Sequence, residues 1–100
     1  MREIIKDLVF RVIEEYRSTY EKDIPTHQGE DTPLFGKEGV LDSLGLVSFI
    51  VMIEQAIEDE LNVSLILADE RAMSQKTSPF LRIGLLIDYI NKLIQEEIQV

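Results

Sequence analysis

The residues best suited to chemistry lie in one short run, Gly39–Gly45 (GVLDSLG), where a glycine-rich loop meets a helical pattern. Ser43 would begin that helix. Asp42 or Ser43 is a competent N-cap, because either side-chain oxygen can accept a hydrogen bond from an unpaired N–H of the first turn. A hydroxyl at a helix N-terminus also presents any phosphodiester built on it to the positive end of the helix dipole. Ser43 is therefore a candidate for covalent attachment of a phosphate-bearing group, with a simple helix cap as the alternative.

Catalytic interpretations of this serine find little support. A serine hydrolase needs a histidine base and an orienting carboxylate, and the only histidine is His27, in the loop of a chain too short for the usual hydrolase sheet. Without a second histidine or a cysteine, metal ligands would have to be carboxylates, which show no calcium-loop spacing. We interpret His27 as a solvated loop residue, assign no catalytic residue and no metal, and expect no enzyme.

Two long helices and a loop would position this run. From Arg2 to about Tyr20, apolar residues recur at steps of three and four and form one helical stripe. A second helix follows from Ser43 to roughly Glu60 with the same periodicity. The stretch 21–42 is rich in glycine and proline, so we expect a long loop. The only residues expected to anchor it are Leu34, Phe35, Val40 and Leu41.

The C-terminal third is expected to be helical as well. A short helix is predicted around Ala68 to Met73. The last helix has Thr77 or Ser78 as its cap and Pro79 in its first turn, and it ends near Glu97. The pattern predicts an all-α fold, a small four-helix bundle with three long helices and one short third helix.

Composition limits both the size and the partners of the protein. The chain has 100 residues, 45% of them hydrophobic, so we expect one domain spanning residues 1–100. Acidic residues outnumber basic ones 19 to 10, and the net charge of -9 would repel nucleic acid and anionic lipid, so its partners should be basic. The opening sequence MREIIKDLVF carries charges throughout. We therefore expect neither a signal peptide nor membrane insertion, and a cytoplasmic location.

The segment Leu41-Asp42-Ser43-Leu44, followed by a helix of apolar and acidic residues, resembles the phosphopantetheine attachment motif of the acyl carrier protein family. The order of helices and loops is similar over most of the chain. The resemblance implies that Ser43 bears 4'-phosphopantetheine derived from coenzyme A. It implies that Asp42 is the preceding acid and that Leu44 is an exposed apolar contact for the modifying and partner enzymes.

The same resemblance implies a function and partners. The terminal thiol of the arm would carry acyl intermediates as thioesters in fatty-acid or related biosynthesis, and it would supply the thiol that a chain without cysteine lacks. The implied partners are a phosphopantetheinyl transferase and acyl- or aminoacyl-activating and synthase enzymes with basic docking patches. Glu54 and Glu58 would form part of the acidic docking face of a monomeric carrier.

Departures from the family pattern leave alternatives open. Directly after Leu44 the sequence GLVSF lacks the acidic or polar residues often found in fatty-acid carriers. GVLDSLG is closer to the D-alanyl carrier proteins, so an aminoacyl cargo of D-alanyl or peptidyl type is one alternative, and an unmodified acidic helical adaptor is another. The second helix is about one turn longer than in either carrier group. An ordinary packed core is favoured over a shelter for a fatty chain at the residues Phe49, Ile53, Ile66, Ile83 and Ile87.

Overall fold

The computed structural model describes residues 1–21, 23–36, 39–67 and 79–98. Its helices are α1 (Arg2–Tyr20), the 3-10 helix η1 (Gly29–Asp31), α2 (Ser43–Leu61) and α4 (Ile83–Ile98). The described ranges contain these three α-helices and no strand, which confirms the all-α prediction at that level. The short helix expected around residues 68–73 lies outside the described residues. No described helix has both the length and the apolar content needed to cross a membrane.

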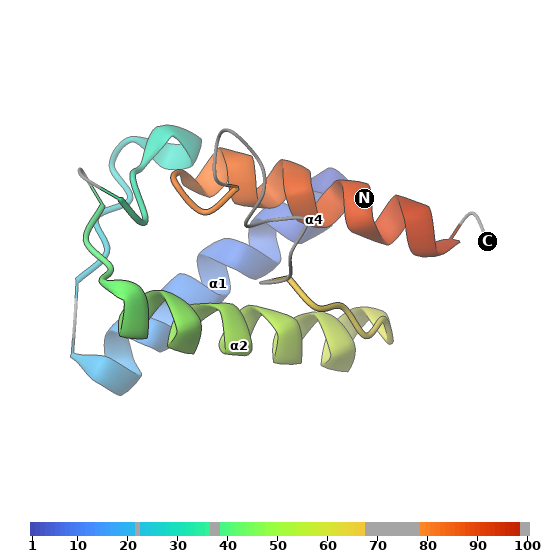
Figure 1. The fold of residues 1–100 in the computed structure, drawn as a ribbon, viewed down its shortest axis with the longest axis horizontal. Coiled ribbons are helices and arrows are strands. Elements are labelled where there is room, and N and C mark those ends of the chain that lie inside the picture. The colour runs from blue at the N-terminus through green and yellow to red at the C-terminus, as the bar shows by residue number, and fades with distance from the viewer. Residues whose placement is uncertain (22, 37–38, 68–78, 99–100) are drawn as a thin grey trace.

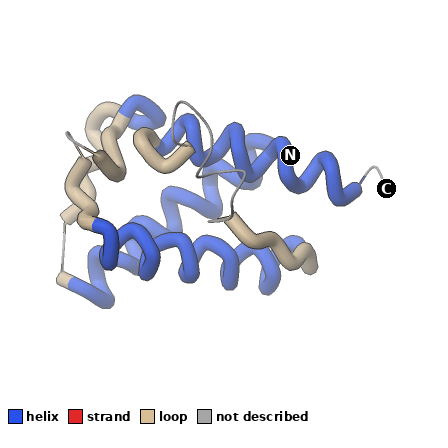
Figure 2. Tube along the Cα trace, in the orientation of Figure 1, coloured by secondary structure: helices blue, strands red, loops and turns tan. Residues whose placement is uncertain are grey.

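The helix α1 is the central element, because it packs against both α2 and α4. In Figure 1, α2 and α4 run across the view along opposite edges of the molecule, and α1 crosses behind them. Figure 2 shows the loop leaving the end of α1, reaching η1 beside the start of α4, and returning to the start of α2. The beginning of α2 therefore lies at the end of the molecule where α1 finishes.

The core is formed by the inward faces of the three helices, as the helical periodicity predicts. The predicted bounds of α1 are confirmed, and α2 ends within one residue of its predicted end. Four of the residues predicted to line the core are fully buried: Phe49, Ile53, Ile83 and Ile87. The prediction for Ile66 is wrong, because 72% of this residue is exposed. Its neighbours Leu65 and Leu67 are buried, so burial alternates along this segment and Ile66 faces solvent.

The long loop is held by more residues than the sequence indicated. Leu34 and Leu41 are buried as expected, and the Leu41 N–H donates to the Leu34 carbonyl oxygen at 3.0 Å. The prediction that only four apolar residues anchor the loop is wrong, because Ile24 is also fully buried. The carbonyl oxygen of Ile24 accepts a hydrogen bond from the Arg17 guanidinium, which fastens the loop to the last turns of α1.

The start of the last helix also differs from the prediction. The expected caps at residues 77 and 78 lie outside the described residues, and Pro79 lies in a turn before α4, which begins at Ile83. The Leu81 carbonyl oxygen accepts from the Leu34 N–H at 2.8 Å, and the Ile83 N–H donates to the Thr32 carbonyl oxygen at 3.1 Å. These hydrogen bonds form an antiparallel bridge between the long loop and the segment before α4, so the helix starts only at Ile83.

Candidate functional site

The first turn of α2 presents Ser43 to solvent. Ser43 is the first helical residue and is exposed, and its hydroxyl has no hydrogen-bond partner among the described residues. The N-cap is Asp42, whose Oδ1 accepts from the Gly45 N–H at 2.7 Å, while its carbonyl oxygen accepts from the Leu46 N–H at 2.8 Å. The N–H groups of Ser43 and Leu44 have no intrahelical acceptor, as at the start of any α-helix. An anion attached to Ser43 would therefore meet two unpaired donors.

Aromatic residues hold this turn against α1. The Tyr16 and Phe49 rings make an edge-to-face contact with centroids 5.8 Å apart, and both residues are buried. A Cβ at Gly45 would lie 3.0 Å from the Tyr16 hydroxyl oxygen and 3.1 Å from Asp42 Oδ1. Glycine thus allows the phenol and the capping carboxylate to approach α2 closely. Burial raises the pKa of the Tyr16 hydroxyl, and the nearby Asp42 carboxylate raises it further.

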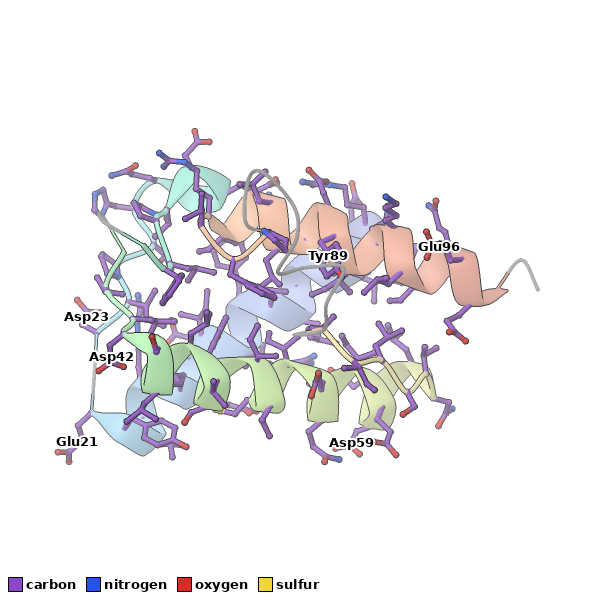
Figure 3. The ribbon with its side chains drawn as sticks, viewed as in Figure 1. Glu21, Asp23, Asp42, Asp59, Tyr89 and Glu96 are labelled. Carbon is purple, nitrogen blue, oxygen red and sulfur yellow. The ribbon has the colours of Figure 1, made fainter. Side chains whose placement is uncertain are left out.

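The surroundings of Ser43 carry negative charge. Figure 3 places Asp42 at the start of α2, with Asp23 and Glu21 at the same end of the molecule. Asp23 forms an ion pair with Arg17, with 3.3 Å between its Oδ1 and the guanidinium Nε. An approaching protein would meet exposed carboxylates around an uncharged hydroxyl.

The outward face of α2 is apolar next to Ser43. Leu44, Val47 and Val51 are 81%, 58% and 56% exposed. Their spacing of three and four residues places them on one face of α2, and we call them the apolar stripe. The exposure predicted for Leu44 is confirmed. The exposure of Val47 and Val51 was not predicted, although a second apolar face at helical spacing was the signal that could have revealed it.

The two predicted docking acids differ in their surroundings. Glu54 is half-buried, and its Oε2 accepts a hydrogen bond from the Leu67 N–H at 2.8 Å. Glu58 is exposed near the end of α2. Glu54, the first acid of α2, thus holds the segment that follows the helix. The first exposed acid of α2 is Glu58, near the end of the helix.

The remaining candidates are not assembled into a second site. His27 is exposed, and its Nε2 lies 3.5 Å from the amide nitrogen of Gln28. In the part of the chain that the structure covers, no hydrogen bond or ion pair links His27 to Ser43 or to a carboxylate. The described ranges hold no group of three histidine, aspartate or glutamate residues suited to a metal ion.

Comparisons with protein-family models, with curated proteins and with solved structures found no match to this chain. The features that indicate a function are therefore the motif and the geometry at the start of α2.

Proposed function

We propose that this chain is a carrier protein that bears 4'-phosphopantetheine on Ser43. The observation that carries the proposal is the exposed, unpaired Ser43 hydroxyl at the first position of a capped helix, within a motif that resembles a carrier attachment site. Asp42 satisfies the Gly45 N–H, which leaves the N–H groups of Ser43 and Leu44 for phosphate oxygens. The phosphodiester would also lie at the positive end of the α2 dipole.

The arm supplies a thiol that holds the cargo as a thioester, and the chain itself catalyses nothing. Tethering makes each transfer effectively intramolecular, with local concentrations of about millimolar for a short flexible arm. We propose acyl intermediates of fatty-acid or related biosynthesis as the cargo, with an aminoacyl cargo of D-alanyl or peptidyl type as the alternative. Fully buried packing at Phe49, Ile53, Ile83 and Ile87 supports an ordinary core, so the cargo question rests on which activating enzyme charges the arm.

The proposal includes the finer expectations about fold, partners and location. These are a four-helix bundle with a short third helix, a cytoplasmic monomer, a phosphopantetheinyl transferase, and activating and synthase enzymes with basic patches. The net charge of -9 supports basic partners, because opposite charge speeds encounter while the contact stays weak enough to release.

The test is intact-mass measurement after incubation with coenzyme A and a broad-specificity phosphopantetheinyl transferase. The native chain is expected to gain one phosphopantetheine, because Ser43 is exposed and lies next to free N–H donors. Ser43→Ala should gain none. Ser48→Ala, which removes a second hydroxyl on the same helix, is the matched control and should be modified like the native chain.

Two results would contradict the proposal. If the native chain gains no mass while remaining folded, the unmodified adaptor becomes the better account. If Ser43→Ala is modified as fully as the native chain, the attachment point is another residue. Once modification is established, loading by an acyl-activating or an amino-acid-adenylating enzyme separates the two cargo classes.

A further inference from the structure

A groove between α1 and α2 continues the apolar stripe away from Ser43. It has a volume of about 530 Å³, and Val51, the last residue of the stripe, is one of its lining residues. On the α1 side it is lined by Arg11, Val12 and Glu15, and on the α2 side by Val51, Met52 and Ala56. The apolar surface thus runs from Leu44 along α2 and into the groove without an interruption by charge, because residues 43–53 contain no charged side chain.

The charges at the rim of the groove that are not in ion pairs are acidic. Arg11 forms an ion pair with Glu60 across the two helices, so the one basic residue of the lining is already paired. Glu15 and Asp59 are exposed, and neither forms an ion pair with another described residue. Asp59 accepts only from the Gln55 amide, at 3.1 Å, and in Figure 3 its side chain points outward from α2.

We infer that this groove docks an amphipathic helix of a partner protein that carries apolar side chains flanked by lysine or arginine. Apolar residues of such a helix would cover Val51, Met52 and Ala56, and its basic residues would face Glu15 and Asp59. Helices commonly bind other helices in this way, with apolar anchors in a groove and charge at the rim. Exposed apolar surface bordered by polar residues marks such interaction sites.

The described helices of a second copy of this chain do not have the chemistry to fill the groove. Every basic residue of α1 is already in an ion pair: Arg2, Lys6, Arg11 and Arg17. The helix α2 has no basic residue, and Lys92 is the only one in α4. Two copies would also bring two acidic rims together, on molecules that each carry a net charge of -9. The occupant is therefore a different, basic protein segment.

The test is a titration of the isotopically labelled, unmodified chain with a short amphipathic helix of leucine and lysine, followed by amide chemical shifts. The largest shifts are expected at the groove residues of α1 and α2. Val51→Asp should weaken binding at least about tenfold, because it places a charge against the apolar face of the peptide. Ile66→Asp is the control, since Ile66 is more exposed than Val51 but lies on the segment that follows α2, outside the groove lining. It should change the affinity less than about twofold.

Charge is tested in the same titration. Replacing Glu15 and Asp59 together by their amides should weaken binding roughly threefold at low salt and less at high salt. A matching peptide of leucine and glutamate should not bind.

Several outcomes would overturn the inference. They are no binding of the lysine peptide, equal binding of the glutamate peptide, shifts centred outside the groove, and self-association of the chain through α1 and α2. Binding of lipid vesicles in place of the peptide would also overturn it. Because the experiment uses the unmodified chain, its failure leaves the Ser43 proposal intact, and failure of Ser43 modification leaves the groove untouched.

Discussion

At the corner where α1 begins, charged groups fasten the long loop to two helices. Arg2 binds Glu30 of η1 and Asp88 of α4, and Lys6 Nζ lies 3.3 Å from a Glu30 carboxylate oxygen. In the first turn of α2, by contrast, no side chain forms an ion pair with another described residue, and the outward side chains include a free hydroxyl and the start of the apolar stripe. The charged groups at the start of α1 are paired within the molecule. The start of α2 instead presents groups suited to contact with another molecule.

Substitutions on the buried and exposed faces of α2 should differ most in their effect on the free energy of unfolding. Phe49→Ala should lower the free energy of unfolding by about 3–5 kcal/mol, because it empties a fully buried site packed against Tyr16. Val47→Ala, on the exposed face, should change it by less than about 0.5 kcal/mol. Urea unfolding of both variants measures the difference. Similar losses would mean that the apolar stripe supports the fold and is not free for a partner.

The close packing within the loop that leads to Ser43 depends on Gly39. A Cβ there would lie 2.5 Å from the carbonyl carbon and oxygen of Leu34, and backbone cannot easily move aside. Gly39→Ala should therefore cost about 2–3 kcal/mol. Gly29 is the control, since it has open space but a φ of +59°, so that Gly29→Ala should cost only about 1 kcal/mol. Thermal unfolding ranks the two, and the reverse order would contradict the account of how the loop is held.

Removing the Asp42 cap of α2 should lower the stability by a smaller amount. Asp42→Ala removes the acceptor of the Gly45 N–H and should cost about 1 kcal/mol. Asp42→Asn keeps a capping oxygen while removing the charge, so it should retain most of the stability in chemical denaturation. An equal loss in both variants would attribute the effect to charge and not to the cap.

Removing the charge of Glu30 should have only a small effect on stability, and the effect should depend on pH. Hydrogen bonding to Arg2, opposed in part by desolvation, lowers the pKa of Glu30 from 4.5 to about 2. Because the folded-state pKa is depressed, the carboxylate stabilises the protein above pH 4.5, and this contribution is lost as pH falls toward 2. Glu30→Gln should thus lower the unfolding temperature slightly at neutral pH and converge with the native chain near pH 2. A difference that grows on acidification would contradict this sign.

The parts of the fold that follow from local pattern were predictable. The span of α1, the start of α2 and the Asp42 cap depend on periodicity and on side chains within a few residues. The start of α4 was not predictable in this way, because Leu81 and Ile83 use their backbone groups to pair with a loop far away in sequence. The burial of Ile24 likewise depends on where the loop crosses α1.

The same distinction between local pattern and distant contacts applies to the candidate site. The sequence located Ser43 and the exposed Leu44, because the motif and the helix start are local features. The contact of Tyr16 with the first turn of α2 and the hydrogen bond from Leu67 to Glu54 depend on packing between elements distant in sequence. For this reason the predicted docking acid Glu54 is half-buried, which its place in the sequence did not indicate.

The most direct test of the carrier claim is to locate the modification by fragmenting the product of the transferase reaction. We expect a single phosphopantetheine on the peptide that contains Ser43, with the phosphodiester on the Ser43 oxygen. The claim would be contradicted by an unmodified chain in a reaction where a competent carrier domain is fully modified, or by a modification on any other residue.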